Sequence, residues 1–309
     1  MREIRNVAVI GGGLIGMSWA GLFLARGMNV TVVDPRQEAE KQLGEFVKNA
    51  WPLLSDLGLT LSEQVQEADF LTDTALLRDI DFVQECGPER IEVKCEIVAS
   101  LESVLPADVV ISSSTSSLKA SDIQCGARHP ERILVGHPMN PPHLVPMVEL
   151  VAGKQTSEQT MRTADAFYRA MERVTIRVKK EVVGHLANRL TSALYREAVY
   201  LAAEGIADIE DIDRAISYGP GMRWALMGPH LTYHLGGGAG GYRHYLDHLG
   251  PTQEARWKEH GTVELTEALK EKLIAGVERE LDSQDRETLV QRRDQALAKI
   301  FVLKKTYGF

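Results

Sequence analysis

Four polar residues stand where a folded chain could use them to move a proton. Ser116 and His137 each follow a short apolar run, Glu149 lies inside one, and Asn188 lies in the first turns of a long helical pattern. A carboxylate in a buried strand is unfavourable without a partner, and a histidine is the natural one. Such a pair would hold a single imidazole tautomer. We therefore predict a His137–Glu149 acid/base dyad, with Ser116 and Asn188 donating hydrogen bonds to the reacting oxygen.

Each of these residues taken singly has a structural alternative. A histidine at the end of a strand is commonly a hydrogen-bonded core residue. Ser116 lies in a run of serine and threonine that could cap the next helix. Asn188 could be an exposed helical residue. The prediction of chemistry depends on all four residues meeting at one place.

The start of the chain has glycines at the spacing used to bind dinucleotides. An apolar run enters Gly11-x-Gly13-x-x-Gly16, and a helical pattern follows. Gly11 permits the tight turn, Gly13 lets the backbone approach a pyrophosphate, and Gly16 lets the helix pack on the strand. The free N–H groups at the helix start, including those of Leu14 and Ile15, attract phosphates. The alternative is an ordinary strand–helix turn in which glycine serves packing only.

Asp34 ends the second apolar run of the chain. A carboxylate there accepts hydrogen bonds from both ribose hydroxyls and repels a 2′-phosphate, which predicts NAD rather than NADP. Arg36 is a counter-signal, and it could equally lie over the adenine. With NAD bound, His137 would remove a hydroxyl proton as hydride leaves the adjacent carbon for the nicotinamide.

Composition limits the possible functions. The 309 residues are 44% hydrophobic and 25% charged, which is typical of a soluble protein with two domains. The net charge of −8 argues against a nucleic-acid or anionic-membrane partner. No run of apolar residues is long enough to span a membrane, and the first strand begins too early for a signal peptide. The three cysteines match no disulfide or metal spacing, so we expect reduced thiols, a cytoplasmic location and no metal.

Strand and helix patterns alternate through the first half of the chain and predict a Rossmann-type, doubly wound parallel sheet. The predicted strands lie near 4–10, 29–34, 81–84, 109–113, 132–136, 145–151 and 174–179. The predicted helices between them lie near 14–26, 37–57, 89–104 and 157–171. Four prolines between 138 and 146 predict an extended loop there.

Beyond residue 180 the pattern is helical, with predicted helices at 184–203, 208–218, 263–280 and 287–306. We therefore expect an NAD-binding domain at 1–183 and an all-helical domain at 184–309 for substrate binding and dimerisation. One face of the helix at 263–280 carries Leu265, Leu269 and Leu273. Such a face packs within its own domain or, as we predict here, in a homodimer.

Several motifs resemble those of the L-3-hydroxyacyl-CoA dehydrogenase family. The Ser-Asn-Thr-Ser-Ser-Leu stretch of the family is matched at 113–118, its Gly-x-His-x-x-Asn-Pro motif at 135–141, and its Gly-Phe-x-x-Asn-Arg-Leu helix start at 184–190. The resemblance implies NAD-dependent oxidation of a 3-hydroxy acid derivative, with Ser116, His137, Glu149 and Asn188 as the catalytic set. It also implies that Glu89 and Lys94 lie near the nicotinamide ribose.

Two departures from the acyl-CoA enzymes bear on the substrate. The segment 39–67 is short and contains only two lysines, which argues against binding the phosphates of CoA. The Arg223-Trp224 pair resembles family members that act on small free acids, carnitine and gulonate among them. Arg223 could hold a carboxylate, while Trp224, Tyr218 and Tyr233 could present aromatic faces to a trimethylammonium group. The alternative is that these aromatic residues only pack.

The predicted reaction is therefore the oxidation of a small quaternary ammonium 3-hydroxy acid, L-carnitine, to 3-dehydrocarnitine. L-Gulonate, another short 3-hydroxy acid or a 3-hydroxyacyl-CoA is the alternative substrate. A non-catalytic NAD-binding structural protein is the distant alternative.

Overall fold

The computed structural model describes residues 3–309. Its internal contacts separate a first unit that ends at Arg189 from a second unit that begins at Leu190. Among residues 3–309, no helix combines the length and the hydropathy required to cross a bilayer.

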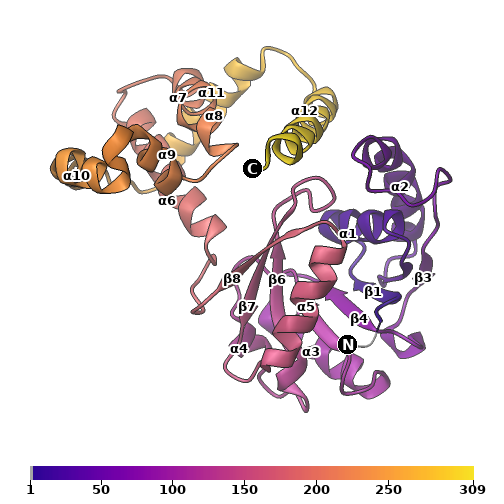
Figure 1. The fold of residues 1–309 in the computed structure, drawn as a ribbon. Coiled ribbons are helices and arrows are strands. Elements are labelled where there is room, and N and C mark those ends of the chain that lie inside the picture. The colour runs from indigo at the N-terminus through magenta and orange to yellow at the C-terminus, as the bar shows by residue number, and fades with distance from the viewer. Residues whose placement is uncertain (1–2) are drawn as a thin grey trace. The chain divides into compact units, whose positions relative to one another are not determined.

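The first unit is built on one eight-stranded sheet with the strand order β3-β2-β1-β4-β5-β6-β7-β8 (Figure 1). Its strands are β1 (Asn6–Ile10), β2 (Asn29–Val33), β3 (Asp69–Leu71), β4 (Phe82–Glu85), β5 (Val110–Ser113), β6 (Ile133–Pro138), β7 (Met147–Ala152) and β8 (Val174–Val178). The chain moves outward from β1 in one direction and then from β4 in the other, which confirms the predicted Rossmann-type fold. The carboxyl ends of β1, β4 and β5 therefore meet at one edge of the sheet.

Two details of the sheet differ from the prediction. β6 and β7 pair antiparallel rather than parallel. The segment between them, residues 139–146, is too short for the crossover that parallel neighbours need. β3 was not predicted, because three residues at the edge of the sheet leave almost no pattern in the sequence.

The helices of the first unit are α1 (Leu14–Ala25), α2 (Glu38–Asp56), α3 (Ile91–Val104), α4 (Ala120–Ile123) and α5 (Glu158–Ala170), with single turns η1 (Thr74–Leu76) and η2 (Pro130–Arg132). Aromatic rings join α1 and α5 to the sheet. Trp19 packs on Tyr168 with centroids 5.5 Å apart, and Phe82 stacks on Phe167 at 4.1 Å. This packing fixes α1, and hence the glycine turn that precedes it.

The second unit is helical. Its helices are α6 (Ala187–Ala203), which begins in the first unit, α7 (Ile209–Tyr218), α8 (Pro220–Trp224), α9 (Pro229–Gly236), α10 (Gly241–Glu259), α11 (Glu267–Leu281) and α12 (Arg286–Tyr307), with the turn η3 (Gly238–Gly240). α8, α9 and α10 were not predicted. Pro220 and Pro229 occupy first helical positions of α8 and α9, where the missing N–H has no partner to lose.

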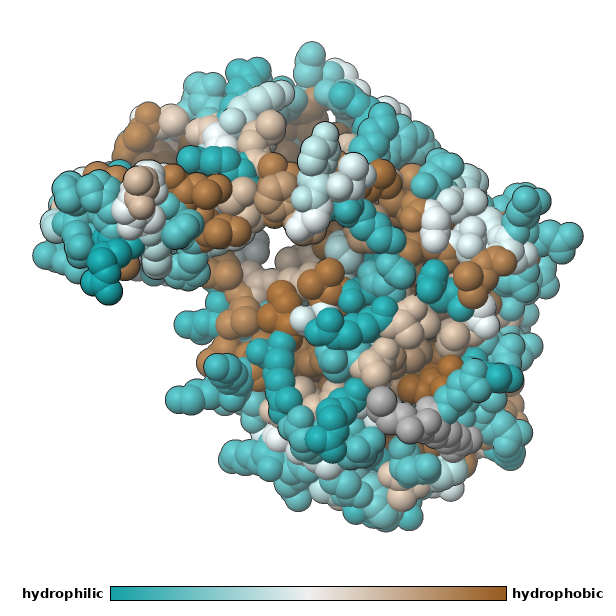
Figure 2. Space-filling model, in the orientation of Figure 1, coloured by the Kyte–Doolittle hydropathy of each residue, from teal (hydrophilic) through white to brown (hydrophobic). Residues whose placement is uncertain are grey.

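Many large hydrophobic side chains of these helices are exposed. They include Leu231, Leu235, Leu246, Ile274, Val277, Ile300 and Leu303. Figure 2 shows such hydrophobic groups among the hydrophilic surface of the molecule.

Candidate active site

The glycine turn between β1 and α1 is shaped to receive a phosphate group. Gly11 has a φ of 106°, and a side chain there would collide with the Cys86 carbonyl. Gly13 faces open space, and no side chain caps the N-terminus of α1. The N–H groups of the first turn, which include those of Leu14 and Ile15, therefore have no side-chain cap. A side chain at Gly16 would collide with the Gly11 carbonyl. These features fit a dinucleotide pyrophosphate.

Beside this turn lies a cavity of about 620 Å³ lined by Gly11, Gly13, Asp34, Arg36, Cys86 and Gly87, among others. Asp34 is buried and accepts a hydrogen bond from the Gly12 N–H at 2.7 Å. Arg36 donates to the same carboxylate through Nε and Nη2, each at 2.9 Å. Burial tends to raise the pKa of Asp34, but the bonds from Arg36 and Gly12 hold it below its ordinary value. The carboxylate is therefore ionised, as discrimination against a 2′-phosphate requires.

A second cavity, of about 360 Å³, shares Cys86 and Gly87 with the first. Its lining also includes Ile15, Glu89, Lys94, Ser116, His137 and Asn188. The two cavities thus run along the carboxyl edge of the sheet, from Asp34 toward His137. This arrangement suits a molecule with the length of NAD, whose nicotinamide end would lie in the second cavity.

His137 lines the second cavity, and Glu149 lies against it. The Nδ1 atom of His137 lies 2.7 Å from Oε2 of Glu149, and both side chains are buried. Because a carboxylate only accepts, Nδ1 carries the hydrogen, and Nε2 is left as the basic nitrogen. Burial tends to raise the pKa of Glu149, but hydrogen bonds from His137 and from the N–H groups of Ala187 and Leu186 hold it below its ordinary value. The acid thus stays ionised beside the imidazole.

Gly136, next to His137, has no room for a side chain. A Cβ atom there would collide with the Ser112 hydroxyl and the Tyr168 hydroxyl. These two hydroxyls are bonded to each other at 2.7 Å, and Tyr168 also donates to Gln84. A buried polar network therefore fixes the backbone just before the imidazole.

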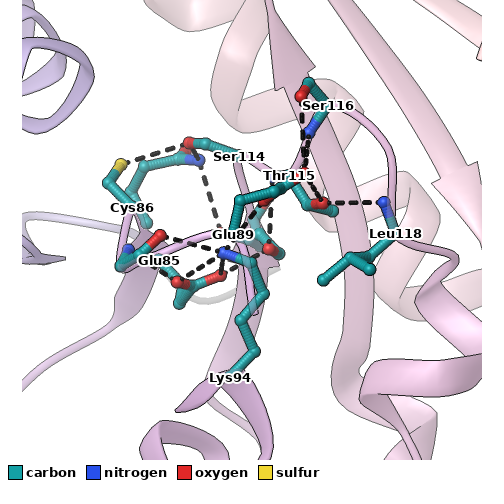
Figure 3. Close-up of polar contacts among 12 residues, drawn as sticks. Glu85, Cys86, Glu89, Lys94, Ser114, Thr115, Ser116 and Leu118 are labelled. Carbon is teal, nitrogen blue, oxygen red and sulfur yellow. Dashed lines mark hydrogen bonds and ion pairs between the residues drawn. The ribbon is translucent and has the colours of Figure 1, made fainter. Parts of the chain in front are cut away.

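Ser116 lies on a loop held by Glu89. One oxygen of Glu89 accepts from the Ser116 N–H at 2.9 Å, the Ser117 N–H at 3.0 Å and the Thr115 hydroxyl at 2.6 Å (Figure 3). Burial tends to raise the pKa of Glu89, and the bonds from Thr115 and Ser117 outweigh it and lower that pKa. Asn188 reaches the same loop, with its Nδ2 atom 3.5 Å from the Ser116 carbonyl. The four predicted catalytic residues therefore gather within the first unit.

Lys94 is fully buried and ion-paired rather than directed at a ligand. Its Nζ atom lies 2.9 Å from both oxygens of Glu85 and 3.7 Å from Glu89 (Figure 3). The predicted cofactor residues Glu89 and Lys94 thus line the cavity, while their charges are directed at protein groups. Glu85 was not predicted from the sequence, although it is a carboxylate at the end of the buried strand β4 and gives the same signal as Glu149.

The predicted substrate residues lie in the second unit. Arg223 and Trp224 are in α8, and Tyr218 ends α7 with 81% of its surface exposed. Tyr233 in α9 stacks on Tyr245 with centroids 4.4 Å apart and planes at 12°, which covers one face of its ring. Within residues 190–309 the structure gives these predicted residues no common hydrogen bond or ring contact.

These features are those of a two-part dehydrogenase, and comparison with known proteins identifies which kind. Residues 6–182 match the family model of the 3-hydroxyacyl-CoA dehydrogenase NAD binding domain, and residues 184–272 match that of the C-terminal domain. The chain belongs to the 3-hydroxyacyl-CoA dehydrogenase family. This confirms the predicted family, its NAD cofactor and its fold.

The chain is similar in sequence to several curated L-carnitine dehydrogenases. One, from Nocardiopsis dassonvillei, is 41% identical over 95% of this chain and 90% of the relative. Another, from Streptomyces coelicolor, is 42% identical over 96% of this chain and 94% of the relative. Among solved structures, 5-formyl-3-hydroxy-2-methylpyridine 4-carboxylic acid 5-dehydrogenase, an NAD+ dependent dismutase, has a TM-score of 0.86, with 26% identity over 98% of this chain and 99% of that one. (S)-3-Hydroxybutyryl-CoA dehydrogenase from Ralstonia eutropha has a TM-score of 0.65, with 26% identity over 75% and 82%.

Proposed function

We propose that this protein is an L-carnitine 3-dehydrogenase, which oxidises L-carnitine to 3-dehydrocarnitine with NAD. The observation that carries the proposal is the buried His137–Glu149 pair at 2.7 Å, in which His137 lines a cavity together with Ser116 and Asn188. The choice of substrate is supported by relatives named L-carnitine dehydrogenase that are 41% and 42% identical over nearly the full chain.

The proposed mechanism assigns one role to each side chain. Nε2 of His137 takes the proton of the 3-hydroxyl, and the ionised Glu149 stabilises the imidazolium that forms. Ser116 and Asn188 donate hydrogen bonds to the same oxygen as negative charge develops on it. Asp34 would hold the adenosine ribose of NAD, and the N–H groups around Gly13 would hold its pyrophosphate. The bound cofactor would supply the acceptor for the hydride of carbon 3.

The remaining proposed substrate contacts come from residues of the second unit. Arg223 would pair with the carboxylate, and Trp224, Tyr218 and Tyr233 would supply aromatic faces to the trimethylammonium group, at about 1–2 kcal/mol for each desolvated contact. The exposed apolar side chains of α11, including Ile274 and Val277, support a homodimer as the working form. A cytoplasmic enzyme, with an NAD-binding domain at 1–183 and a substrate-binding domain at 184–309, completes the proposal.

A substrate panel tests this function. NADH formation is followed with L-carnitine, L-gulonate, 3-hydroxybutyrate and a 3-hydroxyacyl-CoA, each at saturating NAD. We expect kcat/KM to be highest for L-carnitine and NADP to be a poor replacement for NAD. If the protein oxidises L-gulonate but not L-carnitine, then it is an L-gulonate dehydrogenase instead. Tight NAD binding without turnover of any substrate would favour a structural protein.

A further inference from the structure

A second buried imidazole lies beside the catalytic histidine. His185 stands in the turn that leads into α6, is 1% exposed, and has a φ of 49°, in the left-handed region. Its ring centroid is 5.2 Å from that of His137, with the ring planes at 48°. A side chain held in an unfavourable backbone region and packed on a reactive group is a candidate for a role in function.

The hydrogen bond of His185 fixes its tautomer. Nε2 lies 3.2 Å from the carbonyl oxygen of Thr115. Because a carbonyl only accepts, Nε2 carries the hydrogen. Nδ1 then has a lone pair, and it is buried without a hydrogen-bond partner among the described residues.

Titratable groups around His185 come from three other elements. They are His137 on β6, Glu149 on β7 and Glu89 in the loop before α3. Burial first, and then His137, lower the pKa of His185 despite opposing effects of Thr115 and the two carboxylates. A proton on Nδ1 would also be buried without an acceptor. His185 is therefore neutral, and it does not compete with His137 for the proton.

His185 connects the two parts of the site that carry the hydrogen-bond donors. It holds the carbonyl of Thr115, the residue before Ser116. The two residues after it, Leu186 and Ala187, donate their N–H groups to Oε1 of Glu149 at 2.7 Å and 2.9 Å. One side chain thus links the Ser116 loop to the turn that holds the dyad carboxylate.

We propose that His185 is a positioning residue for hydride transfer, which acts by holding the Ser116 loop through its Nε2–H group while it packs on His137. This proposal rests on the proposed function. It predicts that replacing His185 lowers kcat by displacing Ser116. It also predicts that this loss comes from removing the hydrogen on Nε2 rather than from removing the ring.

Two replacements separate the donor from the ring. His185→Phe keeps an aromatic ring, and phenylalanine stands at this place in the family motif quoted above, but it has no donor. His185→Gln lacks the ring but places an amide nitrogen near the position of Nε2. Both replacements put a non-glycine residue at the same left-handed position, so their comparison isolates the donor. We expect kcat with L-carnitine to fall about fivefold to tenfold in His185→Phe, with most of it restored in His185→Gln and the KM for NAD unchanged.

A double-mutant cycle with Ser116→Ala tests the route of the effect. If His185 acts through Ser116, then Ser116→Ala and Ser116→Ala/His185→Phe have the same kcat. Multiplied losses, or a glutamine variant as impaired as the phenylalanine variant, would overturn the proposal. Melting temperatures of all variants identify any loss that comes from unfolding, which the glutamine variant would not repair.

A readout independent of turnover keeps this test separate from that of the proposed function. Long-range ¹H–¹⁵N spectra of the ¹⁵N-labelled full chain report the tautomer of each histidine, with His185→Gln used for assignment. A neutral ring with hydrogen on Nε2 supports the proposal, and hydrogen on Nδ1 or on both nitrogens overturns it. If the wild type does not oxidise L-carnitine, the proposed function fails, and the spectra still decide the role of His185.

Discussion

His137 and Glu149 are directly opposite residues of the antiparallel β6–β7 pair. Directly opposed residues on one face of such a pair are close neighbours, so the sheet itself brings Nδ1 and Oε2 to 2.7 Å. The dyad is therefore set by strand register and does not depend on the folding of a loop. This rigidity suits a catalytic pair that must keep one tautomer and one orientation.

Replacing the imidazole tests the proposed base. We expect His137→Ala to lower kcat by roughly 10³-fold, because no other group is placed to take the hydroxyl proton. The Kd for NAD, measured by fluorescence titration, should be unchanged, because the glycine turn and Asp34 are untouched. His129, whose side chain is 44% exposed, provides a matched control, since His129→Ala should leave kcat and Kd as they are. If His137→Ala turned over at the wild-type rate, His137 would not be the catalytic base.

Acid should destabilise the protein in part through Glu149. The pKa of this carboxyl is lower in the folded chain than its ordinary value of 4.5, so its contribution to stability is present above that pH. The contribution is lost as the pH falls through the lower folded pKa. Urea unfolding midpoints between neutral pH and pH 3 should therefore fall less steeply for Glu149→Gln than for the wild type. The exposed Glu254 is the control, and Glu254→Gln should follow the wild-type curve.

The cofactor preference should depend on the charge of Asp34. We expect Asp34→Ala to raise the KM for NAD about tenfold and to reduce the preference for NAD over NADP, because the ribose loses its acceptor and Arg36 loses its partner. Steady-state kinetics with both cofactors measure this. The double variant Asp34→Ala/Arg36→Ala is the second test. It should bind NAD as weakly as Asp34→Ala does, but it should not show the improved activity with NADP. An unchanged cofactor ratio in both variants would contradict the assignment.

Trp224 offers a test of cation recognition. We expect Trp224→Ala to raise the KM for L-carnitine about tenfold or more and to leave that for 3-hydroxybutyrate nearly unchanged, because only the former has a trimethylammonium group. Trp257 is 59% exposed and has no assigned role, so Trp257→Ala is the control. Equal losses with both substrates would show that Trp224 serves packing.

The sequence was sufficient to predict the Rossmann-type sheet, because each of its long strands is a dense apolar run ended by glycine or a polar residue. The antiparallel pairing of β7 was missed, because the alternation of strands and helices suggested a wholly parallel sheet. The signal was present, since residues 139–146 are too few to form a parallel crossover. α10 could not be predicted in this way. Pro251 lies inside it, and its hydrophobic residues do not follow a clear helical face.

The site was predictable where a residue type conflicts with its surroundings. Glu149 in an apolar strand was such a conflict. Glu85 at the end of β4 was another, but it was not recognised as a site residue. The pairing of Lys94 with Glu85 and the contact of His185 with Thr115 join segments far apart in the chain. No local pattern encodes such contacts, because they arise only once the strands and loops have been brought together.

Gly136 shows how a residue without chemistry can restrict the evolution of an active site. Any larger residue would push β6 away from the hydroxyls of Ser112 and Tyr168, and the imidazole one residue later would move with it. Substitutions that change this enzyme's substrate are therefore expected in the helical unit rather than in the strand beneath the base. The reaction type is held fixed by packing, while the choice of molecule remains free to vary.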